Sequence, residues 1–533
     1  MRAVLLFLAI LFCAAPALAQ PWRITHDHWT AQDEAGFGAF VAAIGNSDCS
    51  SSESCLRDPA NPYRGSDKRF LDIDVDCAKL PYLLRAYYAW KNGLPFSYVD
   101  AVSGEGGDLR FTKTANRAVG RHDIIDHSGG IDAPRAIREM LDSVFSATYR
   151  TDARETRGVL SDFYSPALAP GSIHAGSVVY DINGHVGIVY KVDEDGRIYY
   201  MDAHPDFTLS RSVYGAQFGQ SPMRLGGGLK NWRPFTLVHA HRTAQGLVGG
   251  HMAFAENSDI PDFSLVQYTG TEEGGGKPRF VYDGTPLGFY EYIRVAVSGG
   301  KMTYNPVYEL QATMKTLCND LNDRAQYVNL AISDGMAVRE HPARLPDNIY
   351  GSDNTEWENY GTPSRDARIK AGFVQFHHDL NEMITLWVNR DERIVYDGND
   401  LKADLAAAYE AQSKACTITY LSSDKHPVAM SFDDMVHRLF AMSFDPYMCV
   451  ELRWGDVADS CPDGREKKRW YAAEQRLCNQ PDRTYDIAMG FDLSELRAHA
   501  KGSGIDTPPV IDIKALIDAM PPRVPFRQYY PGD

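Results

Sequence analysis

Several features are scarce in this chain of 533 residues, and each scarcity excludes a class of protein. Beyond the N-terminus no stretch approaches the roughly 18 consecutive apolar residues that a membrane-spanning helix needs, so we expect no membrane span. Positive charge is in deficit, because 54 Lys and Arg stand against 70 Asp and Glu and give a formal net charge of −16. Without an excess of cationic side chains to neutralise phosphates, we expect no nucleic acid as a partner.

Motifs for cofactors and metals are also missing. The glycine run at residues 226–228 precedes no G-K-[ST], so a phosphate-binding loop is not expected. Cys449, Cys461 and Cys478 lack the paired C-x-x-C spacing of a zinc site. The polar cluster at residues 122–127 precedes Ser-Gly-Gly and is explained by a turn. We therefore expect no metal and no bound cofactor.

The N-terminus indicates the compartment. Arg2 is followed by a short apolar run at residues 3–15 and by the small-x-small sequence Ala-Leu-Ala at residues 17–19. This pattern is typical of a bacterial-style secretory signal peptide, so we expect removal of residues 1–19 and a mature chain that starts at Gln20. The alternative, an uncleaved anchor helix, is disfavoured by the short apolar core. We expect a periplasmic or secreted protein.

Export changes the interpretation of the cysteines, because most thiols pair in an oxidising compartment. Cys49 and Cys55 flank a short polar loop and are expected to form a local disulfide. If Cys77 is kept free, an odd number of thiols remains, so one further cysteine is also unpaired. The sequence leaves the connectivity open among Cys318, Cys416, Cys449, Cys461 and Cys478.

Cys77 stands at the head of a predicted helix that ends before Gly93. Apolar residues recur at helical spacing along one face of this segment: Leu80, Leu83, Leu84, Tyr87 and Tyr88. A thiol at a helix N-terminus feels the positive end of the helix dipole and the free N–H groups of the first turn, which favour the nucleophilic thiolate. The alternative is that Cys77 is a buried structural thiol or half of a disulfide.

Three β-strands are predicted at residues 176–180, 185–192 and 197–201, joined by hairpin-type turns. His185 opens the middle strand and Asp202 ends the third, so an antiparallel pairing makes them cross-strand neighbours. A carboxylate beside an imidazole fixes its tautomer and stabilises the imidazolium. Taken singly, each residue is equally well explained as part of a turn, and only the combination with Cys77 indicates catalysis.

The order of these motifs is D-C at a helix head, G-H-V-G-I-V-Y, and a strand that ends in a polar residue before alanine. It resembles the papain-like cell-wall cysteine peptidases of the NlpC type, and more distantly the CHAP amidases, over roughly residues 70–96 and 175–205. The resemblance implies an α+β, papain-like catalytic domain in which Cys77 is the nucleophile, His185 the base and Asp202 the orienting residue. His204 is the alternative third residue, because the family most often has histidine there. The separation of 185 − 77 = 108 residues implies an insertion at about residues 97–170.

We expect four regions along the chain: a signal peptide at residues 1–19, the papain-like domain at 20–245, a small β linker region at 246–300 and a mainly helical C-terminal domain of unknown role at 301–533. In the first domain a helix is predicted at residues 133–145. In the linker region strands are predicted at residues 263–268, 279–282 and 290–297. In the C-terminal domain the predicted helices span residues 305–321, 369–388, 401–415, 431–443 and 465–478.

The sequence thus predicts an exported cysteine hydrolase that cleaves amide bonds through a thioester, with peptidoglycan stem peptides or another peptide as substrate. Because stem peptides carry carboxylates, Arg85 and Arg121 are candidate cationic contacts. One alternative is an acyl or peptidyl transferase, in which an amine intercepts the thioester. Another is a non-catalytic cell-wall-binding or interaction protein with a decayed site. The sequence does not indicate an oligomeric state.

Overall fold

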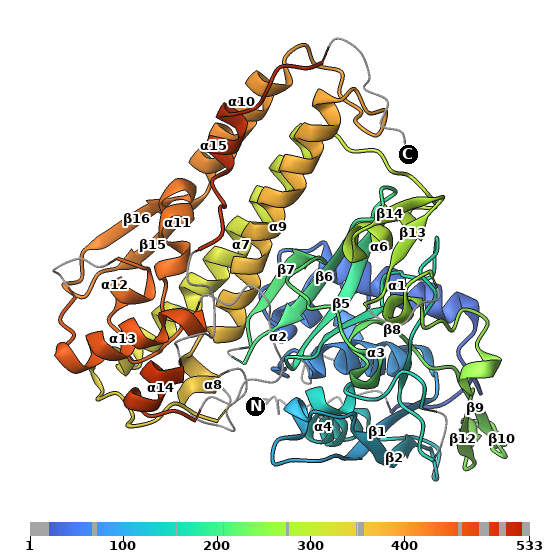
Figure 1. Ribbon diagram of the computed structural model, residues 1–533. Coiled ribbons are helices and arrows are strands. Elements are labelled where there is room, and N and C mark those ends of the chain that lie inside the picture. The colour runs from blue at the N-terminus through green and yellow to red at the C-terminus, as the bar shows by residue number, and fades with distance from the viewer. Residues whose placement is uncertain are drawn as a thin grey trace, which may run out of the picture.

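The computed structural model describes residues 21–66, 72–155, 158–205, 207–272, 277–347, 349, 356–456, 461–478, 490–499 and 508–524. These residues form a mixture of helices and small antiparallel sheets, which confirms the α+β class (Figure 1). The expected signal peptide lies outside the described residues. Among the helices that are described, none is long and apolar enough to cross a membrane.

A six-stranded antiparallel sheet organises the N-terminal half. Its order is β3-β8-β4-β5-β6-β7. The strands are β3 (Phe163–Tyr164), β4 (Val178–Asp181), β5 (His185–Val192), β6 (Ile198–Ala203), β7 (Leu209–Val213) and β8 (Gly228–Trp232). The three predicted strands correspond to β4, β5 and β6 and are confirmed. Gly184 adopts a φ of +85° in the β4–β5 turn, a conformation that favours glycine.

Alternation along β5 and β6 sends side chains to two different cores. Val186 and Met201 belong to a hydrophobic cluster shared with α3 (Lys79–Asn92) and α1 (Ala31–Gly45). Val189 belongs to a second cluster, together with residues of α6 (Phe289–Val297). The sheet is therefore a middle layer, with the helix that follows Cys77 on one face and α6 on the other (Figure 1).

The remaining elements of this half lie outside the six-stranded sheet. The sequence did not predict the hairpin of β1 (Phe96–Ser103) and β2 (Arg117–Ile124), whereas the helix expected at residues 133–145 is confirmed as α4 (Ala133–Ser143). The other short elements are α2 (Ser52–Arg57), β9 (Phe235–Val238), β10 (His241–Thr243), β11 (Gly246–Val248), β12 (His251–Phe254), β13 (Phe280–Tyr282) and β14 (Thr285–Leu287).

Two strand predictions in the linker region are wrong. Residues 263–268 contain the start of a short helix, α5 (Val266–Thr269), and residues 290–297 are helical in α6. The segment in α6 is rich in β-branched and aromatic residues, a composition that a buried helix shares with a strand. The carboxylate of Glu291 accepts a hydrogen bond from the Gly288 N–H and so caps this segment as a helix. This contact favours the helix over a strand. The strand expected at 279–282 is confirmed as β13.

The C-terminal half is mainly helical. Two long helices, α7 (Pro306–Ser333) and α9 (Pro363–Val388), run side by side through it (Figure 1). The other elements are α8 (Glu356–Tyr360), α10 (Leu401–Ala415), β15 (Thr417–Leu421), β16 (Pro427–Ser431), α11 (Phe432–Arg438), α12 (Val450–Arg453), α13 (Arg465–Cys478), α14 (Leu493–His499) and α15 (Ile513–Asp518). All five helices that were predicted here are confirmed, two of them with the expected bounds.

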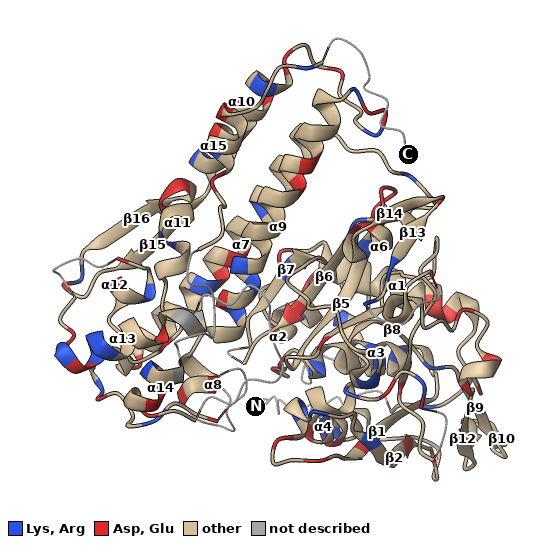
Figure 2. Ribbon diagram, viewed as in Figure 1, with Lys and Arg blue, Asp and Glu red and all other residues tan. Residues whose placement is uncertain are grey.

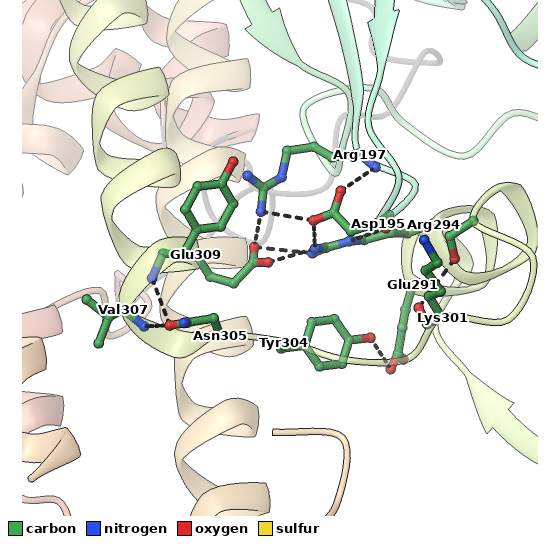
Figure 3. A network of polar contacts seen from close by, with 11 residues as sticks. Asp195, Arg197, Glu291, Arg294, Lys301, Tyr304, Asn305, Val307 and Glu309 are labelled. Carbon is green, nitrogen blue, oxygen red and sulfur yellow. Dashed lines mark hydrogen bonds and ion pairs between the residues drawn. The ribbon is translucent and has the colours of Figure 1, made fainter. Parts of the chain in front are cut away.

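A polar network joins the two halves at the start of α7 (Figure 3). Glu309 accepts a hydrogen bond from Arg294 of α6 at 2.6 Å and another from Arg197, which precedes β6. Arg294 also contacts the carboxylate of Asp195 at 2.6 Å. The helical half is thus anchored at the turn between β5 and β6, at the end of these strands opposite His185 and Asp202.

Candidate active site

Cys77 lies in a turn directly before α3, as the sequence predicts. The Asp76 carboxylate accepts hydrogen bonds from the backbone N–H groups of Ala78 at 3.1 Å and Lys79 at 3.2 Å. This side chain therefore caps the first turn of the helix. The Cys77 Sγ lies 3.9 Å from the carbonyl oxygen of Gly184, the residue before His185.

The cysteine pairing agrees with the expectation for Cys77. Cys49 and Cys55 form a disulfide, and Cys77 is the free cysteine among those whose side chains the structure describes. Two further disulfides join Cys318 to Cys416 and Cys449 to Cys461. Cys478 ends α13, and its side chain is outside the described part of the chain.

The environment of Cys77 does not activate the thiol, which corrects the expectation from its place at a helix head. Burial raises the pKa of Cys77 to about 12, and the negative charge of Asp76 adds to the effect, while the backbone N–H of Val186 opposes it. The first-turn N–H groups that were expected to stabilise the thiolate donate their hydrogen bonds to Asp76 instead. The thiol of this conformation is protonated at neutral pH.

His185 and Asp202 are brought together as predicted. The His185 Nε2 lies 2.5 Å from the Asp202 Oδ2, and both side chains are buried. Burial, aided by the charge of Arg368, lowers the pKa of His185, so its imidazole is neutral at neutral pH. Nε2–H donates to the carboxylate, which leaves Nδ1 as a proton acceptor. Burial would raise the pKa of Asp202, but the neighbouring His204 and His185 outweigh it and lower this pKa below its usual range.

His204, the alternative third residue, lies next to this pair. Its ring stacks on His185 with 5.9 Å between centroids, and its Nε2 lies 2.9 Å from the Ser210 hydroxyl. Ser210 in turn donates a hydrogen bond of 2.6 Å to Asp202 Oδ1. Asp202 therefore makes the direct contact with His185, and His204 supports Asp202 through Ser210.

Among the described residues, no direct hydrogen bond joins the Cys77 thiol to the His185 imidazole. The sulfur contacts the backbone on both sides of His185, at Gly184 and Val186. Val186 packs into the cluster shared with α3, so the His185 side chain projects toward the opposite face of the sheet. A rotation of the imidazole or a shift of the β4–β5 turn is needed before Nδ1 reaches the thiol.

The helical half covers the face on which Asp202 lies. A pocket of only about 20 Å³, about the space of one water molecule, is lined by residues of both halves. Figure 2 shows acidic and basic residues together on α7 and α9 beside β7, and those that line the pocket are Asp320, Asp323, Arg365 and Arg368. Burial, together with the charges of Asp323 and Asp202, raises the pKa of Asp320 to about 7. Sequence reasoning missed these four residues, because no motif connects the helical half to the site.

The two arginines proposed to meet substrate carboxylates are already paired inside the protein. Arg85 contacts both carboxylate oxygens of Glu34, at 2.6 and 2.7 Å, and its guanidinium stacks on Trp29. Arg121 lies 2.7 Å from the carboxylate of Asp162. Both side chains hold the N-terminal half together in this conformation.

Comparisons with known proteins yield no match to this chain, whether with family models, curated proteins or solved structures. The functional conclusion therefore depends on the geometry of the site.

Proposed function

We propose that this chain is an exported cysteine hydrolase of papain-like fold that cleaves amide bonds in peptidoglycan stem peptides. One observation carries the proposal: a neutral, buried His185 donates Nε2–H to Asp202, which leaves Nδ1 as a base beside the backbone that Cys77 contacts. The free Cys77 adds support, because the other cysteines whose side chains the structure describes are all bridged.

The proposed reaction proceeds through a thioester. His185 Nδ1 takes the proton of the Cys77 thiol as the sulfur attacks the amide carbonyl carbon. The imidazolium, stabilised by Asp202, then gives this proton to the leaving amine as the C–N bond breaks. Water attacks the thioester with His185 again as base, and the carboxylic acid and the free thiol are released.

This reaction requires a conformation more open than the one described. The pocket beside Asp202 has room for about one water molecule, and the pKa of Cys77 is raised to about 12 by burial. Movement of α7 and α9 away from β6 and β7 admits a peptide, and a rotation of the His185 imidazole or a shift of the β4–β5 turn brings Nδ1 to the thiol. The closed conformation is thus the latent form of the enzyme.

The test is to incubate the mature chain with purified sacculi under mild reductant and to analyse released fragments by mass spectrometry. Cys77→Ala and His185→Gln should release nothing, because removal of a nucleophile or its base costs several orders of magnitude in rate. Asp202→Asn should be far slower than His204→Gln if Asp202 is the orienting residue. Equal release by wild type and Cys77→Ala would overturn the proposal.

A second candidate, a non-catalytic wall-binding protein, is favoured by the raised thiol pKa and the missing thiol–imidazole hydrogen bond. In that case wild type and Cys77→Ala bind sacculi equally and neither releases fragments. The transferase alternative is tested in the same assay with an added amine, which would appear covalently attached to the released acyl fragments.

A further inference from the structure

Three side chains from distant parts of the helical half converge in its interior. They are His341, Asp445 and Glu474, and each offers one ligand atom within 4.8 Å of the others. The His341 Nε2 lies 2.9 Å from the Asp445 Oδ2 and 3.6 Å from the Glu474 Oε1. The sequence separations are 445 − 341 = 104 and 474 − 445 = 29 residues, so no short motif reveals the cluster.

Within the described part of the chain, polar atoms of all three side chains are buried without hydrogen-bond partners. The side chain of His341 is 2% exposed, and those of Asp445 and Glu474 are 0% exposed. Among the described residues, no hydrogen bond of acceptable geometry reaches His341 Nε2, Asp445 Oδ2 or either carboxylate oxygen of Glu474. Buried carboxylate oxygens without donors are strongly destabilising unless a positive charge compensates them.

The other polar atoms of the cluster are held so that the unpartnered ones face each other. His341 Nδ1 donates to the carbonyl oxygen of Pro342 at 2.7 Å, so Nε2 is the ring nitrogen that faces the carboxylates. Asp445 Oδ1 accepts a hydrogen bond from the Tyr447 N–H at 2.8 Å and turns Oδ2 toward His341. Trp470 stacks on the imidazole with 4.2 Å between ring centroids and fixes its plane.

We propose that His341, Asp445 and Glu474 bind one divalent transition-metal cation. An imidazole nitrogen with two carboxylates suits Zn²⁺ or Mn²⁺, and the two negative charges neutralise the ion. Bonds of about 2.0–2.2 Å keep the ligand atoms of one ion about 3–4.3 Å apart, close to the spacing found here. The ion links the segment before α8, the loop before α12 and helix α13. Because its ligands are buried, its role is to stabilise the helical half.

The test uses the full mature chain without a histidine tag and in a Cys77→Ser background, so that the free thiol binds no metal. After dialysis against EDTA the chain is titrated with Zn²⁺, Mn²⁺ or Co²⁺. We expect one equivalent of metal per chain by elemental analysis, and a melting temperature about 5 °C higher in a 100-fold excess over the dissociation constant. Co²⁺ should show visible absorption bands of a protein-bound ion.

His341→Gln and Glu474→Gln should each lose the bound metal and the Co²⁺ bands, whereas His426→Gln, at an exposed histidine–aspartate pair, should keep both. The circular dichroism of each variant in EDTA shows whether it is folded. In EDTA, Glu474→Gln should melt no lower than wild type, since it replaces a buried carboxyl group whose oxygens lack hydrogen-bond partners among the described residues. A wild-type chain that takes up no metal, or variants that still bind one equivalent, would leave an imidazolium–carboxylate cluster and overturn the proposal.

Discussion

Arg294 of α6 and Glu309 of α7 form an ion pair of 2.6 Å that joins the sheet to the helical half. Arg197 contacts the same carboxylate, and all three side chains are largely buried. Because Arg197 immediately precedes β6, the contact holds the helices over the strand that carries Asp202. The position of the helical half is therefore coupled to access to the candidate site.

Replacing Glu309 with alanine should destabilise this interface, because the two guanidinium groups of Arg197 and Arg294 lose the carboxylate that they share and keep only that of Asp195. Loss of one member of a buried ion pair typically costs about 3–5 kcal/mol. We expect a lower melting temperature and faster amide hydrogen exchange in β6, β7 and the start of α7. Glu410→Ala is the control, because Glu410 is paired with Lys414 on the exposed surface of α10. Unchanged exchange in β7 would show that the network does not hold the halves together.

The raised pKa of Cys77 predicts slow alkylation of the native chain. At neutral pH a thiol with a pKa of about 12 has roughly 10³-fold less thiolate than an ordinary cysteine, and the iodoacetamide rate falls accordingly. Mass spectrometry of quenched samples gives the rate, with the denatured chain as reference. Glu309→Ala should speed the reaction if opening of the interface exposes the thiol. A native rate equal to the denatured rate would contradict the half-buried, protonated thiol.

Arg368 should control the protonation of the candidate base. Burial and the charge of Arg368 both lower the pKa of His185, so Arg368→Gln should raise this pKa toward its ordinary value. NMR titration of chains with labelled histidine measures the change directly. Arg135→Gln, at an exposed position of α4, is the control. An unchanged His185 pKa in Arg368→Gln would place Arg368 outside the site.

Asp320 should make the stability of the folded chain depend on pH. Its pKa is raised from 3.8 to about 7, so between these values the folded chain holds a proton that the unfolded chain releases. The free energy of unfolding therefore falls as pH rises from about 4 to 7. Asp320→Asn should gain stability over wild type through this window and keep a constant advantage above it. Urea unfolding at pH 4, 6 and 8 measures the difference, and Asp379→Asn, exposed on α9, should show none.

Two of the disulfides close loops of very different length and should contribute unequally to the stability of the folded chain. Cys318 and Cys416 are separated by 98 residues, and Cys49 and Cys55 by 6. The chain-entropy model makes the longer loop worth about 2.5 kcal/mol more. Replacing both cysteines of each pair with serine, and comparing melting of the two variants, checks this. A larger loss from the Cys49–Cys55 pair would show that local packing outweighs loop entropy.

The local pattern of the sequence determined much of the secondary structure. The apolar segment at residues 185–192 and the hairpin-type turns on both sides of it predicted β5, and antiparallel pairing then predicted the contact between His185 and Asp202. Helical spacing predicted α3, α7 and α9. These features depend on residues a few positions apart, where period and turn chemistry decide the conformation.

Only the tertiary structure determined the protonation states of the candidate site residues. The pKa of Cys77 depends on burial and on Asp76 as a cap, and that of His185 on burial and on Arg368, which lies 368 − 185 = 183 residues away. The cluster of His341, Asp445 and Glu474 likewise forms only when the helices pack. Long-range packing sets burial and brings distant charges together, and neither leaves a periodic signal in the sequence.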